Sequence, residues 1–591
     1  MSESSNIARH LPLMAARQPD VPAIKVPRGR INEDRIDYLE LSFRELDAEV
    51  DAWVAHLAGQ GVRPGDRVLV MVRQGLPLIA GAFALFKLGA VPVIIDPGMG
   101  RRNFLACVAR SKPRVLLGIP LAQAMSHVFR SAFATVEVRV WVSSSPTARA
   151  PAAKNGHQKS SMVNSAAADL AAVLFTSGST GAPKGVCYEH GMFDAQVRLV
   201  RDAYGIKPGE VDMPMLPIFA LFNPALGMTT IVPELDPARP ASVHPLKITH
   251  AIQQEKVTNS FGSPTLWRII FDHCLQHHIT LPSLRRVLCA GAAVPASVWS
   301  DAQRILTHGA LHSPYGATEA LPICSASYEE VLGRPGRGSR PPGSKPSFFE
   351  IPTAAQGALV GLPLPGNHVR IIALHDGPLA TLDEAQELPP GQIGEIVVTG
   401  PTVTKVYDGL PDATALAKIQ MPEPKTPTKG EITIGAESIG FWSLATPGAV
   451  PPGAIWHRMG DAGYLDDAGR LWFCGRIAER IVTRTTVMHT EPIERVFRGY
   501  PGVARCALVG VGERGQQEPV LVVQPVQDLS SAGRKQLAEE LRALALQQPH
   551  TVAIARFLFH PALPVDVRHN AKIHRLALAK WASGQIPRSA T

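Results

Sequence analysis

Ten residues, 176–185, have the composition of a loop that holds phosphate groups. They follow a short apolar segment, 171–175, which predicts a buried strand. Glycines let the backbone approach a ligand closely, while hydroxyls, free N–H groups and a lysine can bind phosphate oxygens. The spacing is not that of a Walker loop, because Gly185 follows the lysine where Ser or Thr is required. A flexible polar turn is the alternative to a nucleotide-phosphate loop of another kind. The candidate ligands are Thr176, Ser177, Gly178, Ser179, Thr180, Gly181 and Lys184.

A second group with binding chemistry runs from Tyr315 to Glu319. The ring of Tyr315 can stack on a purine, and Gly316 permits close approach to it. The hydroxyl of Thr318 can bind a phosphate, and the carboxylate of Glu319 can hold Mg²⁺. An ordinary surface turn is the alternative for this run.

Three further places offer single contacts to a nucleotide. Gly291, Ala292 and Ala293 follow a predicted strand and could line a flat adenine, although any turn from strand to helix looks similar. Asp461 precedes an apolar strand and could accept both ribose hydroxyls, or could only form a turn. Lys572 stands in a polar loop near the C-terminus, where a solvated lysine is the ordinary expectation.

The elements that must position these residues alternate between strand and helix. Apolar spacing predicts a helix over 43–58, a strand over 67–72, a helix over 78–88 and a strand over 91–95. This alternation favours an α/β fold with largely parallel sheets and flanking helices.

The pattern changes towards the C-terminus. Residues 461–473 read as two strands around a turn, and shorter elements follow that form a compact α+β unit of ordinary domain size. These are a helix at 492–497, a strand at 504–509, a helix at 534–546 and a strand near Phe557. The predicted division is a large domain over 1–475 and a small domain over 476–591. Segments 143–164, 333–352 and 421–453 are predicted to be surface loops with little fixed structure.

Composition excludes several classes of protein. With 591 residues, 45% hydrophobic and 18% charged, the chain can bury large cores. The net charge of +9 suits an anionic ligand, but no run of Lys and Arg forms a stripe for nucleic acid. Seven cysteines without metal-binding spacing indicate reduced cytosolic thiols. Residues 1–10 are polar, and the apolar stretch 76–95 is broken by two prolines and a lysine, so we expect a cytoplasmic chain without a membrane span.

Taken together and in this order, the five sites resemble the adenylate-forming superfamily of acyl-CoA synthetases, luciferases and peptide-synthetase adenylation domains. The similarity covers roughly residues 40–580. It rests on T-S-G-S-T-G-A-P-K-G from Thr176, Y-G-A-T-E from Tyr315, G-E-I-V-V-T-G from Gly394, M-G-D-A-G-Y from Met459, Gly475-Arg476 and Lys572. The resemblance implies a large ATP- and substrate-binding domain of mixed or parallel sheets with flanking helices, and a small mobile α+β domain that carries a catalytic lysine.

The resemblance also implies the chemistry. A carboxylate would attack the α-phosphorus of ATP, with Mg²⁺, to give an acyl-adenylate and pyrophosphate. The loop from Thr176 to Lys184 would hold the phosphates, and Lys572 would bridge the carboxylate and the α-phosphate. Glu319 would carry the metal. The remaining implied roles are ribose binding by Asp461, ribose or phosphate binding by Arg476, catalysis by Lys572, Glu319 and Thr176, and a hinge at Glu479.

The chain departs from acyl-CoA synthetases after this hinge. Residues from Arg480 to Thr490 contain no glycine and no lysine, where those enzymes have a glycine-containing loop beside coenzyme A. Segments 83–92, 219–227 and 564–572 look closer to the olefin β-lactone synthetases of long-chain hydrocarbon biosynthesis. That likeness implies a 2-alkyl-3-hydroxy fatty acid substrate, whose own β-hydroxyl attacks the acyl-adenylate.

Other interpretations stay open at this point. A long-chain fatty acyl-CoA or acyl-carrier-protein ligase is the alternative function, and a non-catalytic scaffold is a third class, which the intact motif residues disfavour. Residues 219–226 would line an apolar pocket or belong to an ordinary core. His569 is a candidate base for lactone closure or a structural loop residue. The resemblance also implies neighbouring enzymes of the olefin pathway as partners.

Overall fold

The computed structural model describes residues 4–32, 35–151, 159–176, 182–236, 239, 242–332, 357–421, 450, 453–566 and 572–586. The predicted loop segment 333–352 and nearly all of 421–453 lie outside these residues. The described ends of the third segment, 143–164, contact the body of the protein. There, Arg149 pairs with Glu49 at 3.1 Å.

The N-terminal part contains a six-stranded sheet in the order β6-β5-β3-β4-β7-β8. All its pairs are parallel except β7 with β8. Helix α3 (Leu76–Leu88) is buried on nearly every side because it is apolar all round. It ends at Gly89, whose φ of 74° suits a left-handed cap. The strands are β3 (Arg67–Met71), β4 (Val91–Ile95), β5 (Val115–Gly118), β6 (Val138–Trp141), β7 (Leu170–Thr176) and β8 (Lys184–Glu189).

Helices cover this sheet and close the largest hydrophobic core. The predicted helix over 43–58 is α2, and a capping box of Ser42 and Glu45 fixes its start. The helices that follow the strands are α2 (Phe43–Gly59), α4 (Arg101–Ser111), α5 (Pro120–Val128) and α6 (His190–Tyr204).

A 14-stranded sheet runs through the rest of the large body. Its pairs from β1 through β10, β9, β11 and β12 to β13 are parallel, as predicted. From β13 onward the pairs are antiparallel, and short turns join the strands of two of them, β13 with β14 and β19 with β20. The strands are β1 (Pro22–Asn32), β2 (Arg35–Ser42), β9 (Val211–Asp212), β10 (Thr229–Ile231), β11 (Asn259–Gly262), β12 (Arg286–Cys289), β13 (Ala310–Ala317), β14 (Ala320–Ser327), β15 (Ala358–Pro363), β16 (His368–Ile372), β17 (Gly394–Thr399), β18 (Lys418–Gln420), β19 (Ile455–Leu465) and β20 (Leu471–Arg476).

Helices α8, α9 and α10 pack a second core beside the parallel half of this sheet. The sheet is therefore mixed, with a parallel and an antiparallel half, and the structure is an α/β fold. The helices of this part are α7 (Asn223–Leu226), α8 (Pro245–Glu255), α9 (Pro264–Gln276), α10 (Ala296–Ile305), α11 (Tyr328–Leu332) and α12 (Pro411–Ala417).

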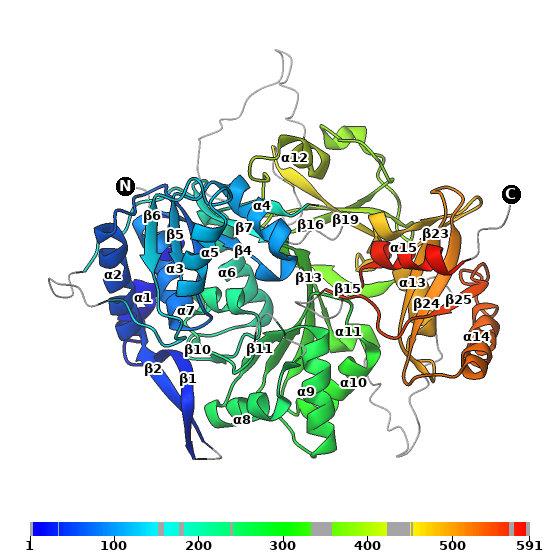
Figure 1. The fold of residues 1–591 in the computed structure, drawn as a ribbon, viewed down its shortest axis with the longest axis horizontal. Coiled ribbons are helices and arrows are strands. Elements are labelled where there is room, and N and C mark those ends of the chain that lie inside the picture. Colours follow the sequence, from blue (N-terminus) through cyan, green and yellow to red (C-terminus); the bar gives the residue numbers. More distant parts are fainter. Residues whose placement is uncertain are drawn as a thin grey trace, which may run out of the picture.

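The C-terminal elements lie together at the right of Figure 1. Strand β23 (Val503–Val511) alternates its side chains between two cores, one on each face of a three-stranded sheet. Both cores consist of residues between 481 and 586. The other elements are β21 (Ile481–Val482), β22 (Val487–Met488), β24 (Glu518–Pro525), β25 (Arg556–Phe559), α13 (Thr490–Phe497), α14 (Ser531–Ala545) and α15 (Arg575–Gln585).

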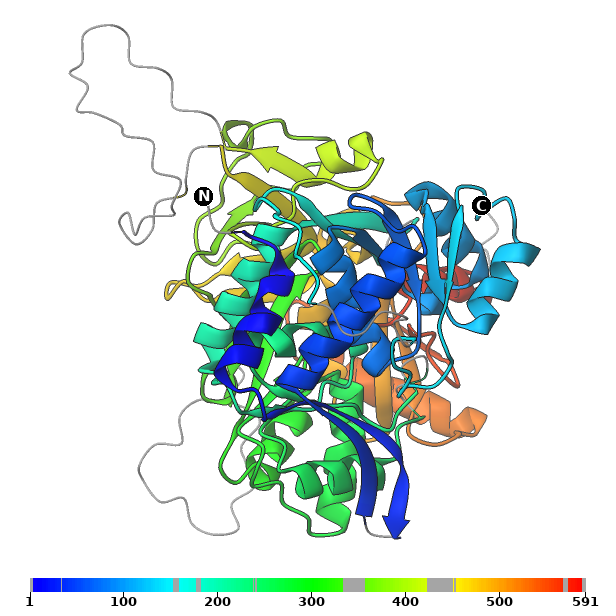
Figure 2. The same cartoon turned by 90° about the vertical axis from the view of Figure 1, so that its left-hand side faces the viewer.

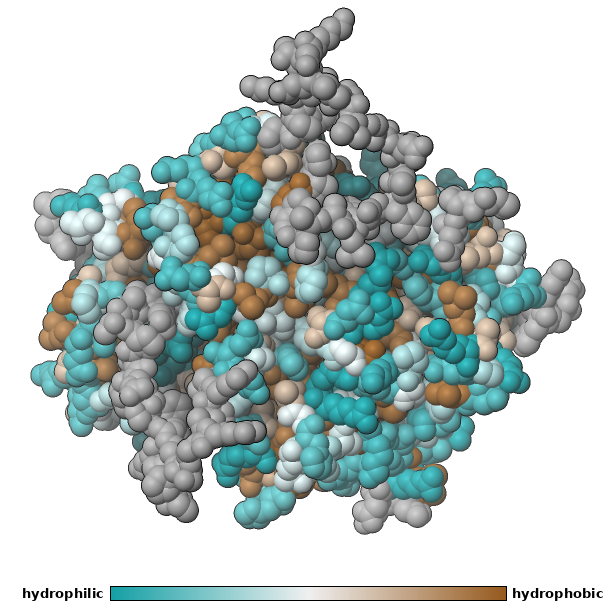
Figure 3. All heavy atoms as spheres, turned by 180° about the vertical axis from the view of Figure 1, so that it is seen from behind, coloured by the Kyte–Doolittle hydropathy of each residue, from teal (hydrophilic) through white to brown (hydrophobic). Residues whose placement is uncertain are grey.

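Two other views complete the shape. Figure 2 shows the N-terminal helices in front and the β1–β2 ribbon reaching away from the body at the bottom. The face opposite to that of Figure 1 mixes hydrophilic and hydrophobic residues, with a hydrophobic area in its upper part (Figure 3). Among the described residues, no helix has the length and apolar character that a membrane crossing needs.

Candidate active site

The phosphate-loop motif begins where β7 ends and finishes where β8 begins. Thr176 and Lys184 are register partners across these antiparallel strands, so the backbone brings the two ends of the loop together. The Nζ of Lys184 lies 4.7 Å from the centre of the Tyr407 ring, a cation–π contact. Five predicted ligands between them lie outside the described residues: Ser177, Gly178, Ser179, Thr180 and Gly181.

The Tyr315–Glu319 motif forms the tight connection between β13 and β14, in which Ala317 pairs with Ala320. A Cβ at Gly316 would stand 2.5 Å from the carbonyl oxygen of Ala320, so the turn requires glycine. The carbonyl oxygen of Thr318 accepts a hydrogen bond from the Tyr188 hydroxyl. The motif is therefore a buttressed hairpin beside the cleft and not an ordinary surface turn.

Glu319 is held by groups that come from a distant part of the chain. Its Oε1 accepts a 2.8 Å hydrogen bond from the hydroxyl of Tyr407. Its carbonyl oxygen accepts hydrogen bonds from the backbone N–H and the hydroxyl of Thr404, at 2.8 and 3.0 Å. Because the backbone and one carboxylate oxygen are both fixed, the side chain is oriented before it meets a ligand.

Asp461 lies within β19, opposite Arg476 on β20. The prediction that it precedes a strand is wrong, because Gly460, with a φ of 66°, forms an irregularity that lets the strand continue. Its Oδ1 pairs with Nη1 of Arg476 at 3.0 Å, and its Oδ2 accepts a 2.7 Å hydrogen bond from the Tyr315 hydroxyl. Burial raises the pKa of Asp461, against the opposing charges of Arg476 and Lys572.

Lys572 comes from the C-terminal part of the chain but faces this group. Its side chain is exposed, and its charge acts on Asp461. Its backbone exchanges two 2.9 Å hydrogen bonds with Asp566, one from each N–H, which fixes the base of its loop. Lys572, Asp461, Glu319 and Lys184 all line one cleft. The predicted base His569 lies outside the described residues.

The small residues that follow β12, Gly291 to Ala293, line the same cleft. Gly291 has a φ of 101°, a conformation that favours glycine, and Ala292 and Ala293 follow it. Small side chains leave room there for a flat group. The cleft is thus lined by small residues, the Tyr315 ring, the carboxylates of Glu319 and Asp461 and the cations Lys184, Arg476 and Lys572.

The apolar run 219–226 divides between the two predicted alternatives. Phe219, Leu221 and Phe222 line the cleft, and the Phe219 ring stacks on Phe261 with their centroids 3.9 Å apart. Residues 223–226, by contrast, are all buried and serve the core as α7. The first half of the segment, 219–222, can contact a hydrophobic ligand, and the buried second half, 223–226, holds the first half in place.

Two residues near Glu319 escaped the sequence motifs. Tyr407 forms a bridge with Val186 of β8, and the Nζ of the buried Lys418 lies 5.9 Å from the centre of the Tyr407 ring. Burial lowers the pKa of Lys418 to about 7, with the charge of Glu319 opposing this shift and that of Lys184 adding to it. Neither Tyr407 nor Lys418 belongs to a recognisable motif, because only pairing between distant segments brings them close to Glu319.

The residues present fit a nucleotide with a divalent cation. Oδ1 of Asp461 is buried and, although it is ion-paired with Arg476, it receives no hydrogen bond of good geometry from the described residues, so a ribose hydroxyl could donate to it. Among those residues, no cluster of three or more His, Cys, Asp or Glu could bind a metal alone. That fits Mg²⁺ at a phosphate site, which needs only one or two carboxylates besides the phosphates.

Comparison with known proteins agrees with this geometry. The family model of the AMP-binding enzymes matches residues 13–408. This chain belongs to the AMP-binding enzyme family. The expected adenylate-forming class and α/β fold are thereby confirmed.

Members with similar sequences and folds are known. An olefin beta-lactone synthetase of Stenotrophomonas maltophilia is 41% identical over all of both chains, and one of Xanthomonas campestris is 40% identical over 99% of both. ATP-bound MatB of Rhodopseudomonas palustris shares the fold, with a TM-score of 0.73, 19% identity and coverage of 98% of this chain and 99% of that one.

Proposed function

We propose that this AMP-forming ligase converts a 2-alkyl-3-hydroxy fatty acid into a β-lactone. The observation that carries the proposal is the meeting of Lys184, Glu319, Asp461 and Lys572 on one cleft, which leads to an apolar wall. The full-length similarity to two olefin beta-lactone synthetases supports the choice of product. The division into domains 1–475 and 476–591, with Lys572 on the smaller, is part of the proposal.

In the first step, a carboxylate oxygen of the acid attacks the α-phosphorus of ATP. A bond from oxygen to phosphorus forms, and pyrophosphate leaves with the electrons of the broken bond. Asp461 and Arg476 hold the ribose, and the small residues from Gly291 lie against the adenine. Lys572 places its charge between the carboxylate and the α-phosphate, where negative charge gathers. Mg²⁺ held by Glu319 would spread the charge of the phosphates.

In the second step, the β-hydroxyl oxygen attacks the acyl carbon. A carbon–oxygen bond closes the four-membered ring, AMP leaves, and the hydroxyl proton is released. The glycine-free hairpin of β21 and β22 supports an internal acceptor, because its β-branched residues limit close approach by an external one. Phe219, Leu221 and Phe222 would contact the alkyl chains.

Product identification tests this proposal. A synthetic 2-alkyl-3-hydroxy acid and its non-hydroxylated analogue are each supplied with ATP and Mg²⁺, with and without coenzyme A. We expect lactone and AMP from the hydroxy acid regardless of coenzyme A, and no lactone from the analogue. Formation of acyl-CoA only when coenzyme A is added, and never of lactone, would favour the acyl-CoA ligase.

We also propose that the enzyme acts in the cytoplasm, because it uses ATP and its seven cysteines form no disulfides. Enzymes of the olefin pathway would be its partners there.

A further inference from the structure

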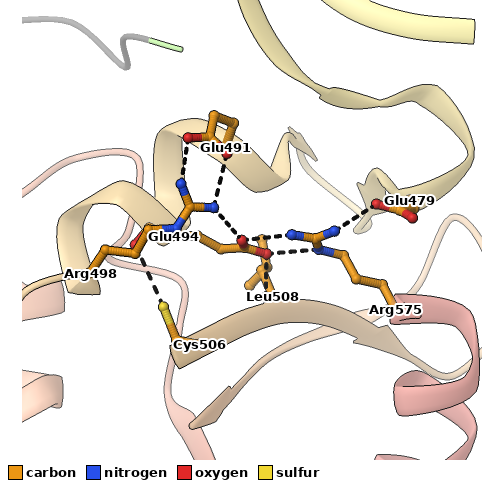
Figure 4. A network of polar contacts seen from close by, with 7 residues as sticks. All are labelled: Glu479, Glu491, Glu494, Arg498, Cys506, Leu508 and Arg575. Carbon is orange, nitrogen blue, oxygen red and sulfur yellow. Dashed lines mark hydrogen bonds and ion pairs between the residues drawn. The ribbon is translucent and has the colours of Figure 1, made fainter. Parts of the chain in front are cut away.

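A chain of ion pairs joins the end of the large sheet to the interior of the C-terminal part (Figure 4). Glu479 ends the short link (Ile477–Glu479) between β20 and β21. Its Oε2 pairs with Nη1 of Arg575 at 3.0 Å. Arg575 also reaches Glu494 of α13 through two hydrogen bonds of 2.8 Å. Arg498 then joins Glu494 to Glu491.

The other charged side chains of this ion-pair network are balanced without Glu479. Within the C-terminal part, Arg498 and Arg575 already balance Glu491 and Glu494. Glu494 is fully buried and also accepts a hydrogen bond from the N–H of Leu508 on β23, so it belongs to that interior. Removing the carboxylate of Glu479 would leave Arg575 paired.

On the other side, Asp461 balances Arg476. Glu479 is therefore an additional carboxylate between two neutral groups, and its side chain is only 8% exposed. Burial raises the pKa of Glu479, while the charges of Arg575 and Arg476 oppose this rise. A buried ion pair of this kind contributes little to stability, because losing hydration offsets the attraction. What the ion pair can do is hold Glu479 and Arg575 in one arrangement.

Arg575 is close to Lys572 along the chain and is coupled to it by the backbone. It is the first residue of α15, three residues beyond Lys572. Between them Ile573 bridges to Val565, and the N–H of His574 donates 2.8 Å to the carbonyl oxygen of Pro564. The segment from Lys572 to Arg575 is thus held as one piece. Where Arg575 is anchored decides where Lys572 stands.

From this geometry we propose that Arg575 is a positioning residue, which uses its ion pair with Glu479 to hold Lys572 opposite Asp461 for adenylation. This inference rests on the proposed role of Lys572 but not on the identity of the product. Arg575 is anchored to its own part of the chain by Glu494 and to the link by Glu479. Only the second contact reaches the link through which the C-terminal elements join β20 of the large sheet.

The test uses the full-length enzyme with the variant Glu479→Gln, which keeps the shape and removes the charge. Adenylation is followed by exchange of pyrophosphate into ATP, with a long-chain fatty acid as substrate. We expect kcat for exchange to fall roughly tenfold while KM for ATP stays within roughly twofold, because a smaller fraction of the enzyme holds Lys572 in place. Glu479→Asp, which keeps the charge, should recover part of the rate.

The matched control is Glu513→Gln, an exposed carboxylate of the same part, which should behave as the wild type. An unchanged kcat in Glu479→Gln would overturn the proposal. So would a loss of rate that accompanies a lower melting temperature and that Glu479→Asp does not recover, because that pattern indicates a purely structural role. Exchange needs no β-hydroxyl, so the result is independent of whether the wild type makes lactone or acyl-CoA.

Discussion

The hydroxyl of Tyr315 donates a 2.7 Å hydrogen bond to Oδ2 of Asp461, a residue 146 positions further along the chain. Tyr315 comes from the hairpin that also carries Glu319, and Asp461 comes from the middle of β19. The contact joins the predicted adenine side of the cleft to the predicted ribose side. The Tyr315 hydroxyl also helps to stabilise the negative charge of Asp461, whose side chain is only 4% exposed.

Replacing this tyrosine should weaken nucleotide binding. In Tyr315→Phe the ring is kept, but Asp461 loses a donor and is held less firmly opposite the ribose. We expect KM for ATP to rise about tenfold, because a hydrogen bond to a charged group contributes about 1.5–3 kcal/mol. Initial rates at varied ATP measure the effect. Tyr328→Phe, which loses an exposed hydrogen bond to Gln303, is the control, and equal KM values for both variants would contradict the prediction.

Lys572 should matter for the chemical step more than for folding or ATP binding. We expect Lys572→Ala to lower adenylation by at least about 100-fold, the usual loss when a charge aimed at the transition state is removed. Pyrophosphate exchange gives the rate, and fluorescence titration with ATP gives the affinity. Lys580→Ala, on the exposed side of α15, should leave both unchanged. If the two variants have similar rates, Lys572 has no part in the mechanism.

The sequence predicts those site residues that belong to short, recognisable motifs. The motifs identify Lys184, Glu319, Asp461 and Lys572 as candidates, and the structure places all four on one cleft. The helices over 43–58 and 78–88 were also predicted, since continuous apolar spacing determines them.

The sequence could not predict what depends on pairing between distant segments. Tyr407 reaches Glu319 only because its backbone bridges to Val186, and no local pattern records that contact. The placement of Asp461 within a strand depends on the irregularity at Gly460, which looks like a turn in the sequence. The hairpin of β19 and β20 is predicted because its turn is local, whereas the pairing of β15 with β20 joins distant segments that no local pattern connects.

The hydroxyl of Tyr407 should affect the requirement for magnesium. Tyr407→Phe keeps the ring beside Lys184 but removes the hydrogen bond that orients the Glu319 carboxylate. We expect the Mg²⁺ concentration for half-maximal rate to rise about tenfold, as is usual when the partner of a metal-binding carboxylate is lost. Tyr328→Phe removes an exposed hydrogen bond to Gln303 and should have no effect. A matching Mg²⁺ dependence in the two variants would show that the Tyr407 hydroxyl does not orient the metal site.

The buried Lys418 should make stability depend on pH. Its pKa is about 7 in the folded protein, against about 10.4 in an unfolded chain, so between these values the unfolded state binds more protons. Stability should therefore rise with pH across this window and fall as pH drops towards 7. Compared with Lys418→Met, the free energy of unfolding of the wild type should gain up to about 1.4 kcal/mol per pH unit. Urea denaturation at pH 7.5, 8.5 and 9.5, all between the two pKa values, measures this difference. The exposed control Lys580→Met should follow the wild type, and a difference between wild type and Lys418→Met that does not change with pH would show that Lys418 stays charged inside the protein.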